Sequence, residues 1–233
     1  MAKKALNNNF HNASKAKEDE FYTQLSDIER ELKYYKKHFK NKVVYCNCDD
    51  PRVSNFFHYF SYNFEKLGLK KLIATCYKNQ SMDLFSQNDK EQAIYLEYDG
   101  DKNGNFEPDP EEIGIKNLKG DGDFRSKECI ELLKQSDIVV TNPPFSRIRD
   151  FIDHAFDIGV KRMVLVCPER LWACKKGLDQ WNRHRPSLWV NLSWREDYLN
   201  KGGSPDRALA VAVWDSPHSD KCEYEIWGKP PRF

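Results

Sequence analysis

Two short apolar runs separated by an amphipathic segment constrain the fold of this chain more than any other feature. The runs Val43-Val44-Tyr45-Cys46 and Leu72-Ile73-Ala74 are typical of buried strands. Between them, Ser54 can cap a helix with an aromatic face, and Gly68 can end it. A strand, a helix and a second strand within about 35 residues make a βαβ unit, which places the two strands parallel in one sheet. The sequence therefore predicts an α/β protein that binds its ligand in the turn after the first strand.

The rest of the chain continues the alternation of strands and helices. Residues 1–17 are rich in Asn and Lys and are predicted to be a disordered or loose arm, followed by a single domain over residues 18–233. Residues 80–119 are predicted to be an acidic insertion that contains a hairpin at Asn103-Gly104. Further strands are expected at residues 93–98, 137–141, 162–167, 188–192, 208–214 and 223–227, and helices at 27–39, 127–134 and 148–156.

Composition limits the classes of function. The net charge of the 233 residues is +1, so any surface for a polyanion must be a local patch. No run approaches about 18 apolar residues and the polar start lacks a signal peptide, so we expect no membrane span and a cytoplasmic location. The cysteine count of seven is odd, and Cys46, Cys76 and Cys167 lie in apolar runs that predict buried thiols. No metal site is predicted, because the calcium-like loop that opens at Asp99 has Pro110 where the last ligand is required.

The most informative motif follows the strand predicted at residues 137–141. Asn142, Pro143, Pro144 and Phe145 combine an amide, a rigid exit and an aromatic ring. The carbonyl oxygens of Asn142 and Pro143 can accept both protons of an exocyclic amine while Phe145 stacks on the ring that bears it. An ordinary turn at the end of a strand is the alternative interpretation. The four residues are therefore candidates for catalysis on a planar amine.

Two other segments are candidates for binding a nucleotide-like cofactor. The turn at residues 47–51 lacks glycine, but Asp49 and Asp50 can accept hydrogen bonds from an amine or from ribose hydroxyls, or they are exposed turn residues. Asp123 followed by Phe124 can bind an adenine ring by its amine and its face, or belong to a glycine-rich turn. Phe21 and Tyr22 precede a predicted helix and can form a hydrophobic staple with it.

A basic, tryptophan-rich stretch follows the motif. Residues 158–195 hold eight basic and two acidic side chains, with four tryptophans among them. Lys and Arg interleaved with aromatic rings is the composition that phosphate contact and base stacking require. A solvated helix face with tryptophans in the core is the alternative.

Taken together, these motifs resemble the EcoRI-type adenine-specific DNA methyltransferase family. The resemblance spans roughly residues 18–160, although Gln24 stands where that class has proline. It is carried, in the family's order, by Asp19-Glu20-Phe21-Tyr22-Thr23, Cys46-Asn47-Cys48-Asp49-Asp50-Pro51, Ser54-Asn55-Phe56, Gly120-Asp121-Gly122-Asp123-Phe124 and Thr141-Asn142-Pro143-Pro144-Phe145-Ser146.

The resemblance implies a Rossmann-like methyltransferase fold with a mostly parallel sheet of seven strands and helices on both faces. It implies S-adenosylmethionine as donor, transfer to N6 of a flipped adenine in double-stranded DNA, and a monomer or weak dimer. Catalysis is assigned to Asn142, Pro143, Pro144 and Phe145. Cofactor contacts are expected from Phe21, Tyr22, Thr23, Asn47, Cys48, Asp49, Asp50, Asp123, Phe124 and Asn142, and DNA contacts from Ser146, Arg147, Arg170, Lys175, Lys176, Arg183 and Arg185.

Little chain remains after the predicted sheet for a target-recognition region, so sequence specificity is expected either to be slight or to reside in residues 170–205. The enzymatic alternative for this chain is an RNA methyltransferase or a protein-glutamine methyltransferase that binds its target amine with the same Asn-Pro-Pro-Phe motif. A DNA-binding relative without catalysis is the non-enzymatic alternative.

Overall fold

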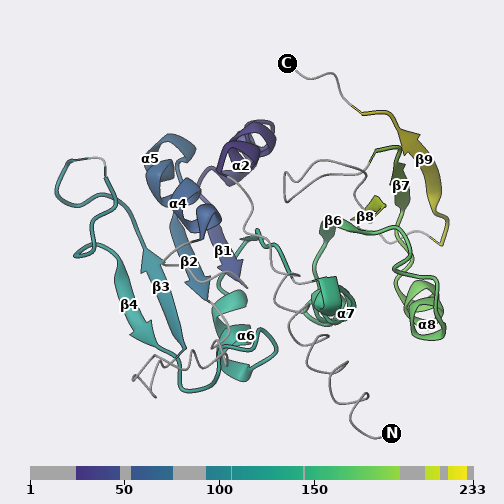
Figure 1. Ribbon diagram of the computed structural model, residues 1–233. Helices are drawn as coiled ribbons and strands as arrows, with labels where there is room; N and C mark the ends of the chain where they lie inside the picture. The colour runs from purple at the N-terminus through teal and green to yellow at the C-terminus, as the bar shows by residue number, and fades with distance from the viewer. Residues whose placement is uncertain are drawn as a thin grey trace, which may run out of the picture. The chain divides into compact units, whose positions relative to one another are not determined.

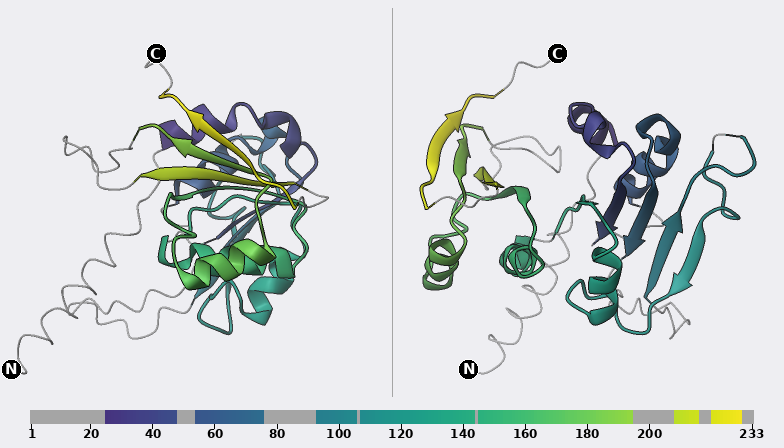
Figure 2. Two further views of the ribbon diagram at one scale, coloured as in Figure 1. Left: turned by 90° about the vertical axis from the view of Figure 1, so that its right-hand side faces the viewer. Right: turned by 180° about the vertical axis from the view of Figure 1, so that it is seen from behind.

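The computed structural model describes residues 25–47, 54–75, 93–105, 107–143, 145–194, 208–215 and 220–229. The chain divides into two compact units, which we call the N-terminal unit (Tyr22–Pro143) and the C-terminal unit (Pro144–Phe233). Each unit has its own sheet and its own helices (Figures 1 and 2). The protein is therefore of mixed α/β class.

The N-terminal unit is built around the predicted βαβ element. Its sheet has the order β4-β3-β2-β1-β5, with β1 and β2 parallel and β5 parallel to β1 on the other side. β3 pairs antiparallel with β2, and β4 antiparallel with β3. The strands are β1 (Val43–Asn47), β2 (Lys71–Thr75), β3 (Ile94–Tyr98), β4 (Gly114–Asn117) and β5 (Ile138–Val139).

Helices cover both faces of this sheet. α4 (Asn55–Tyr62) begins at Ser54, whose hydroxyl accepts the Phe57 N–H, as the sequence predicts. After α5 (Phe64–Leu67) the chain turns at Gly68 with φ +63°, a left-handed conformation that suits glycine. α4 packs its aromatic face on the side of the sheet that carries Val44 and Leu72, both fully buried. The other face carries Tyr45, which contacts Cys129 of α6 (Lys127–Leu133).

The prediction of one helix over residues 27–39 is wrong. The segment forms α2 (Leu25–Leu32) and the short α3 (Lys36–Phe39), with a turn between them. The Tyr34 and Tyr35 N–H groups bond to carbonyls three residues back, which tightens the helix and ends it. Burial explains the break, because Ile28 and Phe39 are the anchored positions while Tyr34 and Tyr35 are exposed.

The C-terminal unit has a four-stranded sheet in the order β6-β8-β7-β9. β8 pairs antiparallel with both β6 and β7, and β9 is an edge strand parallel to β7. The helix η2 is of 3-10 type, and α7 and α8 lie on one face of the sheet (Figure 2). The elements are η2 (Phe145–Arg147), α7 (Ile148–Asp157), β6 (Arg162–Pro168), α8 (Lys175–Arg183), β7 (Leu188–Leu192), β8 (Leu209–Asp215) and β9 (Glu223–Trp227).

The strand arrangement differs from one mostly parallel sheet of seven strands. The described strands form two sheets, of five and four strands, and four of their seven pairings are antiparallel. The segment that turns back after β3 places β4 antiparallel beside it, and β8 enters between β6 and β7. The same order of strands and helices along the chain is compatible with parallel or antiparallel pairing. The pairing depends on whether each connection turns back beside its strand or crosses over the sheet.

Burial confirms two of the three thiols that the sequence places in strand cores. Cys46 and Cys167 are buried, whereas Cys76 lies outside the described residues. Burial also raises the pKa of the Cys167 thiol to about 12, so this thiol stays neutral. Among the helices that the structure describes, none has the length and apolar character needed to cross a membrane.

Candidate functional site

The carboxyl ends of β1 and β5 meet at one edge of the N-terminal sheet. Backbone bonds join the strands, from Asp137 N–H to the Val43 carbonyl and from Val140 N–H to the Tyr45 carbonyl, each 2.9 Å. Beyond the last backbone bond, the Thr141 hydroxyl donates to the Asn47 carbonyl at 2.7 Å. The strand order reverses at β1, which has β2 on one side and β5 on the other, and open α/β sheets bind ligands where such a reversal occurs.

Asp137 holds the start of β5 against β1. Its carboxylate accepts the Val43 N–H at 2.9 Å and lies 3.3 Å from the Lys42 ammonium. The Val43 N–H, followed by Lys42, keeps the pKa of Asp137 below its ordinary value. Together with Thr141, this carboxylate sets the register at both ends of the two-residue strand β5. The sequence predicts the strand but not these two hydrogen bonds, from the Val43 N–H to the Asp137 carboxylate and from the Thr141 hydroxyl to the Asn47 carbonyl.

The catalytic candidates begin directly after Thr141. Asn142 is half-buried and Pro143 is buried, so the amide and the prolyl carbonyl start at the edge where Asn47 ends β1. Val139 is more exposed than a buried strand predicts, because β5 is the edge strand of the described sheet. Pro144 lies outside the described residues, and Phe145 is the first residue of η2 in the C-terminal unit.

Neutral polar groups line the sheet below this edge. Asn47 is 7% exposed and Thr75, at the end of the adjacent strand β2, is 1% exposed. The Tyr45 hydroxyl and the Thr75 hydroxyl share a hydrogen bond of 2.7 Å. Burial raises the pKa of the nearby Cys129 thiol, which therefore stays protonated. The described side chains on this part of β1 and β2 and on the neighbouring α6 are thus an amide, two hydroxyls and a neutral thiol.

Arg125 occupies both members of the predicted adenine pair. Asp123 accepts hydrogen bonds from Arg125 Nη2 at 2.7 Å and from Nε at 3.0 Å, and the guanidinium lies 5.3 Å from the centre of the Phe124 ring. Asp123 and Phe124 are half-buried, just before α6. A ligand amine that binds Asp123 therefore has to share the carboxylate with Arg125. Six further cofactor candidates, Phe21, Tyr22, Thr23, Cys48, Asp49 and Asp50, lie outside the described residues.

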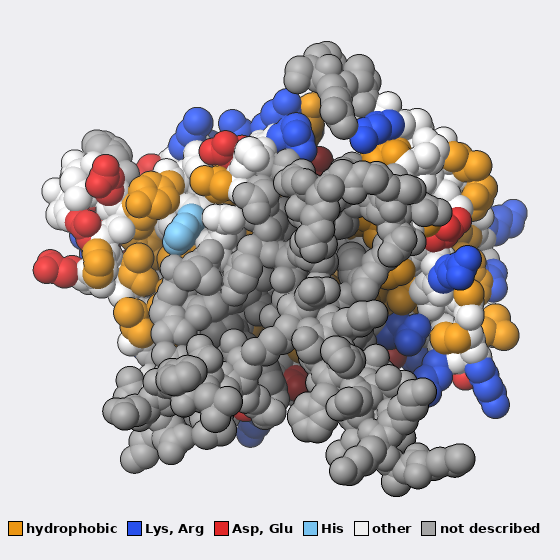
Figure 3. Space-filling view, viewed as in Figure 1, with side chains coloured by type: hydrophobic (Ala, Val, Ile, Leu, Met, Phe, Trp, Pro, Cys, Tyr) orange, Lys and Arg blue, Asp and Glu red, His pale blue; other side chains and the backbone are white. Residues whose placement is uncertain are grey.

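The DNA-contact candidates of the C-terminal unit fall into two groups. Arg183 pairs with Asp153 at 3.1 Å, Arg185 donates to the Asp220 carbonyl, and Arg147 pairs with Asp150 at 3.2 Å. Arg170, Lys175 and Lys176 are exposed and form no ion pair within the described part of the chain. Ser146 is exposed as well. The second group presents free positive charge near the amino end of α8, where Lys and Arg lie beside hydrophobic side chains (Figure 3).

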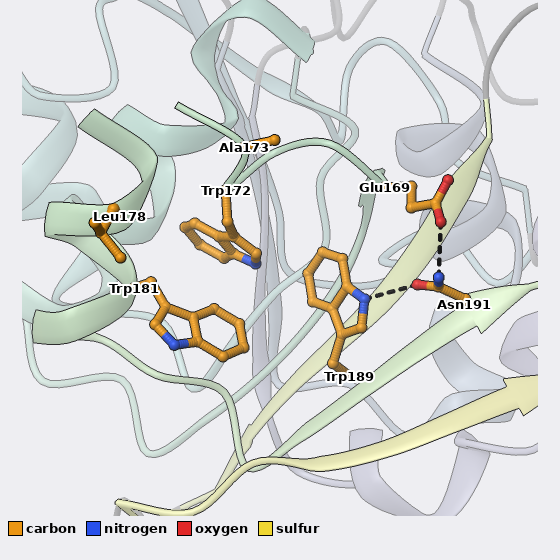
Figure 4. A pocket seen from close by; sticks show the side chains of 7 residues that line it. All are labelled: Glu169, Trp172, Ala173, Leu178, Trp181, Trp189 and Asn191. Atoms are coloured by element: carbon orange, nitrogen blue, oxygen red, sulfur yellow. Dashed lines mark hydrogen bonds between the residues drawn. The ribbon is translucent and has the colours of Figure 1, made fainter. Parts of the chain in front are cut away.

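A pocket of about 440 Å³ is lined by residues 169–191 of the basic stretch, and residue patterns alone did not predict it. Its rings are those of Trp172, Trp181 and Trp189, with centroids 5.6 to 6.3 Å apart (Figure 4). Its polar groups are Glu169 and Asn191. Glu169 is one of only two acidic residues in the basic stretch of residues 158–195. An isolated acidic residue in a basic stretch was the one feature of the sequence that could have indicated the pocket. Ala173 and Leu178 complete the lining.

Metal ligands do not gather in the part of the chain that the structure describes. Within those residues, no group of three or more His, Cys, Asp or Glu side chains is placed to hold a metal ion.

A family model described as adenine-specific methyltransferase EcoRI matches residues 9–168. The chain belongs to this family. Among its curated relatives, the Type II methyltransferase M.EcoRI of Escherichia coli is 52% identical over 165 residues, which are 71% of this chain and 50% of the relative. No solved structure matches the chain.

Two mycoplasma proteins are also similar. The Type II methyltransferase M.MgeORF184P of Mycoplasma genitalium is 46% identical over 144 residues, which are 62% of this chain and 39% of the relative. The Type II methyltransferase M.MpnI of Mycoplasma pneumoniae is 43% identical over 156 residues, which are 67% of this chain and 43% of the relative. The chain thus spans half or less of the length of M.EcoRI and of both mycoplasma proteins.

The end of the family match divides the candidate residues. Every cofactor and catalytic candidate lies within the matched segment, together with Ser146 and Arg147. The tryptophan pocket and the remaining basic candidates follow residue 168. Membership of the adenine-specific methyltransferase family therefore bears on the β1–β5 edge and leaves the pocket unassigned.

Proposed function

We propose that this protein transfers a methyl group from S-adenosylmethionine to N6 of an adenine that is flipped out of double-stranded DNA. The single observation that carries the proposal is the β1–β5 edge, where the Thr141 hydroxyl binds the Asn47 carbonyl and Asn142 follows at once. Open α/β sheets bind their ligands outside the carboxyl ends of the strands at such a reversal of strand order, which supports the proposal. Family membership and three relatives named Type II methyltransferases support the same chemistry.

The proposed mechanism depends on two hydrogen-bond acceptors and one ring. The adenine amine is a poor nucleophile because its lone pair is conjugated with the ring. Acceptance of its two protons by the Asn142 side-chain carbonyl and the Pro143 backbone carbonyl favours a tetrahedral nitrogen, while Phe145 stacks on the base. S-adenosylmethionine supplies an activated methyl group on a sulfonium.

Asn142 and Pro143 would hold the amine with its lone pair toward the methyl group of a bound sulfonium, so that the thioether would be the leaving group and the extra proton would pass to solvent. The motif therefore requires no general base. Positioning and the removal of water carry most of the rate enhancement. Flipping the base from the duplex costs a few kcal/mol before the reaction starts.

The donor set of the N-terminal unit fits S-adenosylmethionine. Asp123 and Phe124 offer a carboxylate and a ring to an adenine, which would share both groups with the Arg125 guanidinium. Asn47 and Asn142 offer amides at the strand ends. Contacts from Phe21, Tyr22, Thr23, Cys48, Asp49 and Asp50 are proposed from the family motif.

At the level of the whole protein, residues 18–233 are proposed to form one Rossmann-like methyltransferase domain with seven core strands. Residues 1–17 are proposed as an arm, residues 80–119 as an acidic insertion, and residues 170–205 as the target-contact region. Double-stranded DNA is the proposed partner of a monomer or weak dimer in the cytoplasm.

The test is a transfer assay with tritium-labelled S-adenosylmethionine and unmethylated duplex DNA of mixed sequence. Digestion to nucleosides is expected to place the label in N6-methyladenine. Parallel assays use structured RNA and a glutamine-containing protein as acceptors. Label in either of these but not in DNA rejects the proposed substrate. Salt-dependent DNA binding without transfer or any response to the cofactor rejects enzymatic activity.

A further inference from the structure

The tryptophan pocket is held open by tight packing around it. Trp172 comes from the loop after β6, Trp181 from α8 and Trp189 from β7, and the three rings face one hollow (Figure 4). Gly177 in α8 allows the helix to approach the loop closely. A Cβ at that position would lie 2.8 Å from the Leu171 carbonyl oxygen and from Trp172 Cα. The loop, the helix and the strand thus form one packed support for the rings.

One end of the pocket carries a hydrogen-bond acceptor in a defined orientation. Trp189 Nε1 donates to Asn191 Oδ1 at 2.7 Å, which directs the Asn191 amide nitrogen to Glu169 Oε1, also at 2.7 Å. The second carboxylate oxygen of Glu169 accepts no hydrogen bond from any residue that the structure describes. A carboxylate in this setting selects a ligand that presents an N–H group and disfavours a carbonyl oxygen.

Positive charge flanks the pocket but does not line it. Arg170 is adjacent in sequence to Glu169, and Lys175 and Lys176 begin α8 before Leu178 and Trp181. All three cations are exposed. Flat aromatic rings with exposed cations close by in the chain suit a nucleotide, whose base is planar and whose phosphate is anionic.

We propose that this pocket binds a single unstacked nucleobase that bears an exocyclic amine, with the amine on Glu169 and the neighbouring phosphates on Arg170, Lys175 and Lys176. The site is additional to the methyl-transfer function and lies after the segment that matches the family model. The volume of about 440 Å³ falls within the ordinary range for small-ligand pockets, about 300 to 1,000 Å³.

The experiment measures the binding of labelled single-stranded oligonucleotides of about six nucleotides to the full chain by fluorescence anisotropy. Oligo-dA and oligo-dC carry the amine and are expected to bind several-fold more tightly than oligo-dT, which presents a carbonyl at that position. Glu169→Gln supplies an amide that also donates, so this preference is expected to disappear while the total affinity for oligo-dT rises.

Trp181→Ala removes a ring and is expected to weaken the binding of all three oligonucleotides by about tenfold. Trp227→Ala is the matched control, because Trp227 is a half-exposed ring on β9 that does not line the pocket. Should Trp181→Ala fail to fold, Glu169→Gln still decides the proposal, because the Glu169 side chain is exposed.

Two outcomes overturn the proposal. The first is binding that shows no preference among the bases and no response to Glu169→Gln or Trp181→Ala. The second is tighter binding of a trimethyl-lysine peptide than of any oligonucleotide, which identifies a cage for quaternary ammonium groups. Methyl transfer measured in parallel separates the two proposals. Transfer without base preference rejects only the pocket, and base preference without transfer rejects only the enzymatic function.

Discussion

The two compact units place their functional groups by different means. In the N-terminal unit, backbone pairing brings Asn47 and Asn142 to one sheet edge, and small side chains such as Thr141 complete the arrangement. In the C-terminal unit, packed indole rings on three different elements form the pocket. All six tryptophans of the chain lie after residue 144. The comparison shows that strand order determines where the candidate residues of the β1–β5 edge lie, whereas side-chain packing determines where the tryptophan pocket lies.

This distribution also supplies a measurement. Tryptophan fluorescence reports on the C-terminal unit alone, while far-ultraviolet circular dichroism reports on both units. A substitution in one unit can therefore be assigned to that unit, and a shift in both signals indicates coupled unfolding.

The largest expected effect belongs to Asn142→Ala. Loss of an acceptor for the amine protons should reduce methyl transfer by on the order of a hundredfold to a thousandfold, with the affinity for S-adenosylmethionine largely kept. Transfer kinetics and cofactor titration measure the two quantities. Asn117→Ala, at an exposed position of β4, is the control and should leave both unchanged. Equal loss of transfer and cofactor affinity contradicts the role assigned to Asn142.

Gly177→Ala should break the support of the tryptophan pocket. The added methyl group meets backbone atoms of residues 171 and 172, so we expect the C-terminal unit to lose about 1–3 kcal/mol of unfolding free energy. Urea unfolding followed by tryptophan fluorescence measures this loss. Gly228→Ala is the matched control, since a Cβ there meets nothing within 4 Å. An unchanged urea midpoint for Gly177→Ala contradicts the tight packing.

The N-terminal unit should show a pH dependence that comes from Glu97. Burial alone would raise the pKa of this carboxyl group, but Lys116 and Lys71, the latter at 2.6 Å, hold it below its ordinary 4.5. Because the pKa is lower in the folded state, the stabilisation is present above pH 4.5 and is lost as the pH falls through the folded pKa.

Glu97→Gln should therefore lower the unfolding free energy by about 1 kcal/mol at neutral pH and have less effect in acid. Unfolding followed by circular dichroism, at neutral pH and in acid, measures the free-energy difference between the variant and the wild type. If the units unfold separately, the tryptophan signal does not move. A difference between the variant and the wild type that grows in acid contradicts the sign of this argument.

The smallest effect concerns the start of α8. Cys174 Sγ accepts the Gly177 N–H at 3.3 Å, so the thiol caps the helix. Cys174→Ala should cost about 0.5–1 kcal/mol, and Cys174→Ser, which restores a capping oxygen, should equal or exceed the wild type. The tryptophan-detected midpoint ranks the three proteins. The same midpoint for all of them shows that the cap is not needed.

Prediction from sequence was most successful where local pattern and burial agree. The apolar run at residues 43–46 forms β1, Ser54 caps α4 and the run at residues 188–192 forms β7, as predicted. It was wrong for residues 27–39, because spacing cannot show that the middle of a periodic segment lies in solvent. The strand at residues 137–141 shortened to β5 because a sheet edge pairs on one side only.

The sequence alone determined the order of the motifs, the parallel β1–β2 unit and the position of Asn142 after a strand. These features depend on hydrophobic periodicity and turn residues, which are local properties of the chain. Tertiary structure decided the antiparallel neighbours, the engagement of Asp123 by Arg125 and the three-tryptophan pocket with its carboxylate. These features join residues that are distant in sequence or compete for one partner. Their energies depend on the distances and solvent exposure that folding creates.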